Sequence, residues 1–188
     1  MSFEHTRTLA LGCIAALAAA IPAHAADYVQ AGGSALTFAT QYQGEVFNGR
    51  VPKFDTRLRF DPAKLASARL DVTFPLSGVT VGNPEGDEAL RGADFFNISK
   101  FPQARFSATK FRRLGGNRYA ADGALSLRGV SKPVTLTFTW TPGLAPVLQG
   151  KATVRRLNFG VGGGDWADTS LIPDDVAINT KVVFKPAK

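Results

Sequence analysis

Apolar and polar residues alternate with a period of two along most of this 188-residue chain. In the segment FDTRLRF, Phe54, Leu58 and Phe60 fall on one face of an extended chain, and Arg57 and Arg59 fall on the other. Such alternation predicts antiparallel strands with one apolar and one solvated face. Strong patterns of this kind predict strands at 54–60, 68–74, 134–140 and 176–184, and weaker ones predict strands at 35–41, 106–111, 119–127 and 148–155.

Turn signals rich in Gly and Pro separate these strands, as at Gly115-Gly116-Asn117, which predicts a hairpin. Short helices are predicted at 86–91 and at 63–67. Because the chain has no repeat, low-complexity tract or linker, we expect a single domain after the first 25 residues. About eight regularly spaced strands make this an all-β fold, either a sandwich or a barrel.

The first 25 residues have the pattern of an export signal. An apolar run at 9–20 leads to Ala23-His24-Ala25, which matches the A-x-A cleavage motif of signal peptides. The run is too short for a transmembrane helix, which needs about 20 apolar residues. We therefore expect cleavage after Ala25, localisation in the periplasm, and a mature domain at 26–188.

Cleavage changes the chemistry that remains. It removes His5, His24 and Cys13, which are the only histidines and cysteine of the chain. The mature domain then has no imidazole for proton transfer near neutral pH and no thiolate for nucleophilic catalysis or soft metals. We accordingly predict no catalytic residues, no metal site and no cofactor.

The mature domain keeps the net charge of +7, because the first 25 residues carry one Arg and one Glu. A basic excess of this size favours solubility and is also compatible with contact with an anionic membrane surface or ligand. Export argues against a nucleic-acid partner. We therefore expect no nucleic-acid partner, and we consider a transient contact of the protein with a membrane surface.

Two local motifs match sites of known chemistry but lack the required context. Residues 162–167 satisfy the G-x-G-x-x-G/A pattern of dinucleotide-binding turns, yet Pro173 and Asp174 follow where a helix is needed. Ser107 and Lys110 match S-x-x-K, but in a strand these positions point to opposite faces. We reject both and expect the glycines to form a loop between two strands.

Trp166 is the notable residue of this glycine-rich loop. A large aromatic side chain there either caps the mouth of a cavity or anchors the loop to the core, and we favour anchoring. In the strand at 119–127, Ala121 and Gly123 share the apolar face. These small residues either leave room for a ligand or accommodate packing and a bulge.

Four segments, taken in order, carry a resemblance to a known family. They are VFNGRVPKFDTRLRFDP (46–62), DEALRGADFFNISKFPQARF (87–106), DGALSLRGVSKPVTLTF (122–138) and RRLNFGVGGGDWADTSLIPDDVAI (155–178). Together they resemble the YceI-like family over nearly the whole mature chain. One departure is that Phe38 is followed by Ala39-Thr40-Gln41-Tyr42, where the family usually has a His, so no role of that His transfers.

The resemblance implies an extended, eight-stranded, antiparallel, lipocalin-like barrel with one or two short helices. It further implies a periplasmic protein that binds a polyisoprenoid or related amphiphile in an elongated apolar cavity, and dimers are common in the family. A barrel of about eight strands has room for one small ligand. Homodimerisation and an isoprenoid or other lipid ligand are therefore the partner hypotheses.

The predicted cavity lining consists of residues expected to be buried, either in ligand contact or in core packing. They are Phe38, Phe60, Leu70, Val72, Phe95, Phe96, Phe106, Leu125, Leu136, Phe138, Trp140 and Trp166. Arg91 and Arg156 lie next to predicted loops and are the candidates for contact with an anionic head group.

The function hypothesis is a binding or carrier protein for a long apolar ligand, and two alternatives stay open. A carboxylate-based hydrolase would need two acids facing the cavity, with Asp87-Glu88 and Asp174-Asp175 as candidate pairs. A partner-binding protein would instead have a solid core.

Overall fold

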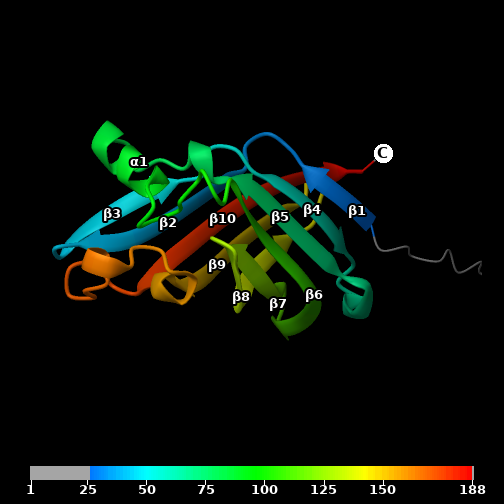
Figure 1. The fold of residues 1–188 in the computed structure, drawn as a ribbon. Coiled ribbons are helices and arrows are strands. Elements are labelled where there is room, and N and C mark those ends of the chain that lie inside the picture. Colours follow the sequence, from blue (N-terminus) through cyan, green and yellow to red (C-terminus); the bar gives the residue numbers. More distant parts are fainter. Residues whose placement is uncertain (1–25, 188) are drawn as a thin grey trace, which may run out of the picture.

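The computed structural model describes residues 26–187, so the predicted signal peptide at 1–25 lies outside the described residues. The chain forms a long, strongly twisted barrel (Figure 1). Its strands are β1 (Ala26–Gln30), β2 (Ala35–Tyr42), β3 (Glu45–Arg50), β4 (Asp55–Phe60), β5 (Arg69–Pro75), β6 (Gln103–Gly115), β7 (Arg118–Leu127), β8 (Val130–Thr141), β9 (Val147–Arg155) and β10 (Asp175–Pro186).

The sheet closes on itself because β1 pairs with both β4 and β10. Along one edge of β10, Lys185 pairs with Val29 of β1, and Ala177 pairs with Ala39 of β2. β1 and β2 therefore act as one interrupted strand, and β3 and β4 form its equally interrupted partner. The ring thus counts eight antiparallel strands, which confirms the predicted fold class.

A short break separates β1 from β2. Gly33 adopts a φ of 83°, in the left-handed region that favours glycine. The Ser34 hydroxyl donates to the Ala31 carbonyl at 2.8 Å and accepts a hydrogen bond from the Val183 amide at 3.0 Å. These contacts replace strand pairing with β10, so the kink does not open the barrel.

The two ends of the barrel differ. At the mouth lie the connections 43–44, 76–102, 128–129 and 156–174, and at the closed end lie 61–68, 116–117 and 142–146. The mouth carries helix α1 (Pro84–Arg91), near the predicted 86–91, and the 3-10 turns η2 (Leu76–Gly78), η3 (Arg156–Phe159) and η4 (Gly164–Trp166). The second predicted helix is the 3-10 turn η1 (Leu65–Ser67) at the closed end. Within residues 26–187, no helix is long and apolar enough to cross a membrane.

Helix α1 begins with a well-formed N-cap. The Asn83 side chain accepts a hydrogen bond from the Gly86 amide at 2.7 Å, and Pro84 occupies the first helical position. The Asp87 carboxylate accepts hydrogen bonds from the Val81 amide and the Thr80 hydroxyl, both at 2.7 Å. These bonds fix α1 against the preceding loop, so that it turns Leu90 inward over the mouth.

A cluster of aromatic rings fills the closed end. The Phe60 ring lies 5.1 Å from that of Tyr119, 5.2 Å from Trp140, 5.7 Å from Phe138 and 5.9 Å from Phe111, measured between ring centroids. Most of these pairs are tilted or edge-to-face, the geometry that aromatic quadrupoles favour. The barrel is therefore solid at this end, and we call these five rings, with Tyr28 and Phe184, the aromatic plug.

Gly123 serves packing and not ligand space. A Cβ atom at this position would lie 2.8 Å from the Phe106 ring and 2.5 Å from the Ser107 carbonyl oxygen. The adjacent β6–β7 register shifts between Ala108 and Lys110, which marks a bulge. Of the two interpretations of the small residues in this strand, the packing and bulge interpretation therefore holds for Gly123.

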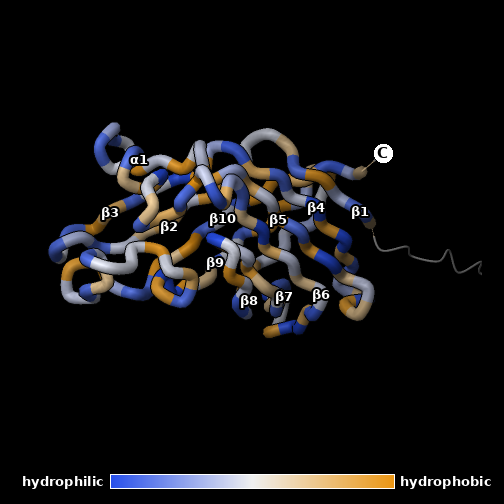
Figure 2. The backbone as a smooth tube through the Cα atoms, in the orientation of Figure 1, coloured by the Kyte–Doolittle hydropathy of each residue, from blue (hydrophilic) through white to orange (hydrophobic). Residues whose placement is uncertain are grey.

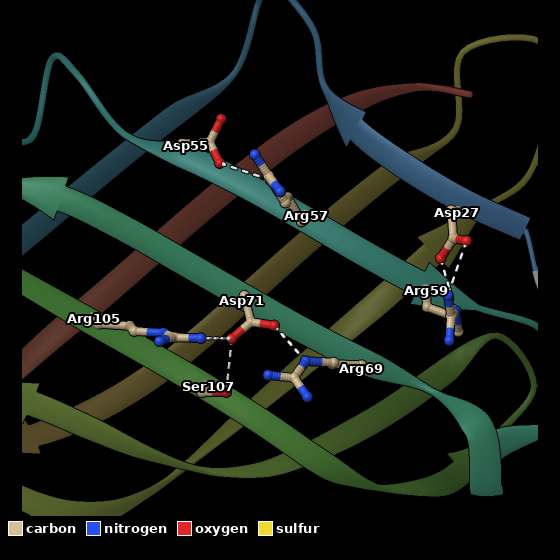
Figure 3. A network of polar contacts seen from close by, with 8 residues as sticks. All are labelled: Asp27, Asp55, Arg57, Arg59, Arg69, Asp71, Arg105 and Ser107. Carbon is tan, nitrogen blue, oxygen red and sulfur yellow. Dashed lines mark hydrogen bonds and ion pairs between the residues drawn. The ribbon is translucent and has the colours of Figure 1, made fainter. Parts of the chain in front are cut away.

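The outer face carries the polar half of the alternation, which is visible along the strands in Figure 2. Asp71 on β5 is held by Arg69 and Arg105, each at 2.6 Å, and by the Ser107 hydroxyl at 2.8 Å (Figure 3). Partial burial raises the pKa of Asp71, but these three hydrogen bonds outweigh burial and lower that pKa to about 2.

We expect the substitution Phe60→Ala to lower the free energy of unfolding by roughly 3–5 kcal/mol, because it leaves a cavity in the aromatic plug. Denaturant unfolding measures the change. As a control, Leu144→Ala removes a fully exposed side chain and should change the stability by less than about 0.5 kcal/mol. Equal losses in the two variants would contradict the role of the plug.

A second prediction concerns acid stability. The pKa of Asp71 is lower in the folded protein than its ordinary 3.8. Its contribution is thus complete above about pH 4 and is lost as the pH falls toward 2. Asp71→Asn should lower the stability by about 1 kcal/mol at neutral pH, after allowance for solvent screening, and by less at pH 2.

Unfolding curves from pH 2 to 7 check this prediction. Asp55→Asn is the matched control, because the Asp55–Arg57 pair is exposed and 3.7 Å long. A pH-independent effect of Asp71→Asn would contradict the assignment.

Candidate functional site

An apolar cavity of about 360 Å³ occupies the mouth half of the barrel, above the aromatic plug. This volume lies near the lower end of the roughly 300–1,000 Å³ typical of ligand pockets. The inward faces of β2, β4, β5, β6, β7, β8, β9 and β10 all contribute to its wall, and the loops at the mouth cover it. The solid-core alternative is therefore wrong for this half of the barrel.

The structure brings nine of the predicted lining residues together around this cavity. They are Phe38, Leu70, Val72, Phe95, Phe96, Phe106, Leu125, Leu136 and Trp166. Their contact with a ligand stays a prediction, but their side chains share one apolar surface.

Three predicted lining residues lie elsewhere. Phe60, Phe138 and Trp140 belong to the aromatic plug and are 2–4% exposed. They share the inward face of their strands with the cavity residues, but they lie nearer the closed end. They therefore stabilise the barrel below the cavity and do not form its wall.

Other lining residues were missed by the sequence analysis. Leu148, Ile178 and Val182 lie on inward positions of predicted strands, so the same alternation could have identified them. Val161 and Ile172 come from the loops at the mouth, where no periodic pattern indicates which side chain turns inward.

Arg156, one candidate for head-group contact, is instead a structural residue. Its side chain is buried, with 4% of the residue exposed. All five of its N–H groups are engaged at 2.5–3.1 Å by the carbonyl oxygens of Val161, Gly162, Trp166, Ile172 and Pro173. Because no donor is left over, the guanidinium is not free to bind an anionic head group in this conformation.

Burial lowers the pKa of Arg156, and the Asp174 carboxylate partly offsets this effect. An Arg guanidinium nevertheless stays protonated in proteins. Asp174 does not bond to Arg156; it accepts hydrogen bonds from the Leu157 amide at 2.9 Å and from Arg155 at 2.8 Å. The positive charge is therefore compensated mainly by carbonyl dipoles.

The glycine-rich segment makes room for this guanidinium. Gly162 has a φ of 66°, and a Cβ atom there would lie 2.6 Å from Arg156 Nη1. Gly162 also donates its amide hydrogen to the Asp94 carbonyl at 2.7 Å, which ties the loop to the segment after α1. The predicted loop between two strands is confirmed, and its glycines allow the close approach of a side chain to the backbone.

A second arginine ties the mouth together in a similar way. Arg128 adopts a φ of 52° in the two-residue turn between β7 and β8. Its guanidinium donates to the carbonyl oxygens of Ala93, Asp94 and Gly160. Arg128 and Arg156 thus join three connections of the mouth without using a carboxylate as partner.

Trp166 combines the two roles considered for it. Its backbone carbonyl is held by Arg156 at 2.8 Å, and its ring lies 5.6 Å from that of Phe95. The same residue lines the cavity. It is therefore anchored in position and forms part of the wall at the mouth.

Arg91, the other head-group candidate, lies outside the cavity wall. It is on α1, where it forms an ion pair with Glu88 at 3.4 Å. Its side chain is 38% exposed. Surface ion pairs of this kind contribute little to stability.

The cavity wall offers little chemistry beyond apolar contact. Among its described lining residues, Arg156 is the one charged residue, and none is Asp, Glu, His or Cys. Within residues 26–187, no group of three acidic, His or Cys side chains could hold a metal ion. The acid pair that the hydrolase alternative needs is thus absent from this wall, and Asp87 and Asp174 serve the structural hydrogen bonds described above.

A closed antiparallel barrel with an internal apolar cavity defines the class of small ligand-binding β-barrels. A family model described as the YceI-like domain matches residues 28–184. The chain therefore belongs to the YceI-like domain family, as its sequence motifs predicted.

Curated relatives agree with this assignment. The chain is 34% identical over 137 residues to a UPF0312 protein of Shewanella denitrificans, a match that covers 71% of each chain. It is 39% identical over 88 residues to a UPF0312 protein of Yersinia pestis, which covers 47% of this chain and 45% of that one.

Solved structures share the fold. BcnA of Burkholderia cenocepacia superposes with a TM-score of 0.77 at 29% identity, covering 80% of this chain and 95% of that one. A polyisoprenoid binding domain of Saccharophagus degradans superposes with a TM-score of 0.67 at 13% identity, covering 87% and 100%. The second likeness shows the shared fold alone.

We expect Arg156→Lys to lower the stability by roughly 2–4 kcal/mol, because an ammonium has three donors and leaves at least two carbonyls unpaired. Denaturant unfolding and limited proteolysis within 156–174 measure the effect. Arg155→Lys is the control, since that side chain is 65% exposed and should cost less than about 1 kcal/mol. Unchanged proteolysis of the loop in Arg156→Lys would contradict the structural role.

Proposed function

We propose that this protein is a periplasmic binding or carrier protein for a long apolar ligand, a polyisoprenoid or a similar amphiphile. The observation that carries the proposal is the apolar cavity of about 360 Å³, closed below by the aromatic plug. Such a cavity suits a molecule that binds by burying its apolar surface and not through charged or reactive groups.

The energetics of the cavity support this proposal. Each buried methylene contributes roughly 0.8 kcal/mol before the costs of ordering the ligand. A micromolar dissociation constant corresponds to about 8 kcal/mol. A few isoprene units can therefore supply such affinity without any polar contact, and the wall described above provides the apolar surface.

Two further observations support the ligand class and the location. One structural neighbour is named as a polyisoprenoid binding domain, and it shares the fold of this chain. The sequence before Ala26 has the pattern of an export signal, which favours the periplasm. In that compartment, a carrier could move an apolar molecule through water between membranes.

The sharpest test of the ligand is direct. Protein purified from its own host should carry a prenyl lipid or related amphiphile, which native mass spectrometry and lipid extraction would identify. Protein that is repeatedly free of lipid and does not take up the isoprenoid hydrocarbon farnesene in titration would contradict the proposal.

We also expect Ala152→Phe to abolish or weaken farnesene binding at least tenfold, because Ala152 lines the cavity and a phenyl ring there occupies the ligand space. The unfolding midpoint should change little, since the ring enters existing volume. The control is Thr153→Phe, which places the same ring on the exposed outer face of β9. Equal farnesene affinity in the two variants would contradict the assignment of the binding site.

A further inference from the structure

One polar group in the cavity wall is left unpaired. Thr56 lies on β4, is 0% exposed and lines the cavity. Its hydroxyl oxygen is buried and has no hydrogen-bond partner among residues 26–187. Thr56 shares the inward face of β4 with Leu58 and Phe60, so the strand directs this side chain into the barrel.

A second unpaired oxygen belongs to the neighbouring strand. In the β1–β4 register, Val29 pairs with Arg57, and continuing this register by one residue places Gln30 opposite Thr56. Gln30 shares its face with Tyr28, whose ring packs into the aromatic plug. The side-chain oxygen of Gln30 is also buried and lacks a partner within the described chain, but Gln30 is not among the residues that line the cavity.

An unpaired hydroxyl at this buried position is unfavourable. A buried polar group without a partner costs roughly 1–3 kcal/mol, whereas valine would fill nearly the same volume without that cost. The surrounding wall is apolar, with Val72 directly opposite Thr56 on β5. A bound molecule that forms a hydrogen bond with the Thr56 hydroxyl would remove this cost.

We propose that Thr56 forms a polar subsite for the uncharged hydroxyl end of an isoprenoid-type alcohol, which binds with its hydroxyl inside and its chain toward the mouth. This inference rests on the proposed function and specifies the chemistry and direction of its ligand. A ligand hydroxyl suits the unpaired Thr56 hydroxyl, because each of the two groups can donate a hydrogen bond to the other or accept one from it.

The charge of the cavity wall argues for an uncharged end group. Arg156 is the one charged residue among the described lining residues, and its five donors already bind carbonyl oxygens. A phosphate placed beside Thr56 would be buried without a counter-charge, which is strongly unfavourable. An anionic head group would therefore have to stay outside the cavity.

A matched control exists within the same cavity. Thr40 on β2 lines the wall, and its hydroxyl oxygen is also buried without a partner in the described part of the chain. It lies nearer the hairpin at the mouth and is partly exposed. Thr40→Val therefore removes the same chemical group from the other end of the cavity.

The test compares three probes with one carbon skeleton: farnesol, the hydrocarbon farnesene and farnesyl phosphate. We expect wild-type protein to bind farnesol more tightly than the other two, by calorimetry or competition titration. Thr56→Val should weaken farnesol binding about tenfold, which corresponds to about 1.4 kcal/mol, and leave farnesene binding unchanged. Its unfolding midpoint without ligand should equal or exceed that of wild type, while Thr40→Val should leave the preference for farnesol intact.

Three results would overturn the subsite. They are an unchanged farnesol preference in Thr56→Val, a loss of that preference in Thr40→Val alone, and tighter binding of farnesyl phosphate than of farnesol by wild type. In each of these cases the proposed function still stands, provided that the wild-type protein binds farnesene. If the wild-type protein binds neither farnesene nor farnesol, the proposed function is wrong, and the proposed subsite is wrong with it.

Discussion

A guanidinium held by five backbone carbonyls organises the mouth of this barrel. Arg156 follows directly after β9, and its hydrogen bonds gather the chain from Val161 to Pro173 around one buried charge. That segment has little regular secondary structure of its own, so these hydrogen bonds hold its conformation. The cavity wall at the mouth, including Trp166 and Ile172, therefore depends on a polar interaction, although the wall itself is apolar. A buried charge that is compensated by carbonyl dipoles is stable only when every carbonyl oxygen is in position to accept its hydrogen bond.

The barrel divides its inward face between stability and binding. The aromatic plug packs edge to face at the closed end and leaves no room for a guest, whereas the mouth half keeps an apolar volume lined by strands and loops. A solid end stabilises the closed sheet, so the open end can tolerate unfilled space. Among the described residues, the cavity wall accordingly consists mainly of apolar side chains, because apolar area and shape suffice to hold an apolar ligand.

Alternation along the chain predicted most strands and an all-β fold, because a period of two depends only on which face meets the core. The barrel and the family came instead from the resemblance of four sequence segments to the YceI-like family. Alternation did not predict β1 or β3, since Ala26–Gln30 and Glu45–Arg50 are short and weakly patterned. Nor could it separate Phe60 and Trp140 from Phe106, because alternation gives the face of a residue and not its height along the barrel. The role of Arg156 could not be predicted from the sequence for a different reason. Its partners are backbone carbonyl groups, which every residue carries, so only the folded path of the loop identifies them.

The pairing of β1 with β10 has a consequence for how the chain reaches its native state. The contact joins Val29 to Lys185, near opposite ends of the described chain. Contacts between residues so far apart in sequence carry a large loop-closure entropy and form late. Until the final strand β10 is available, β1 and β9 can pair on one side only, and the barrel stays open. Closure of this barrel is thus a late event that requires the described chain from β1 to β10.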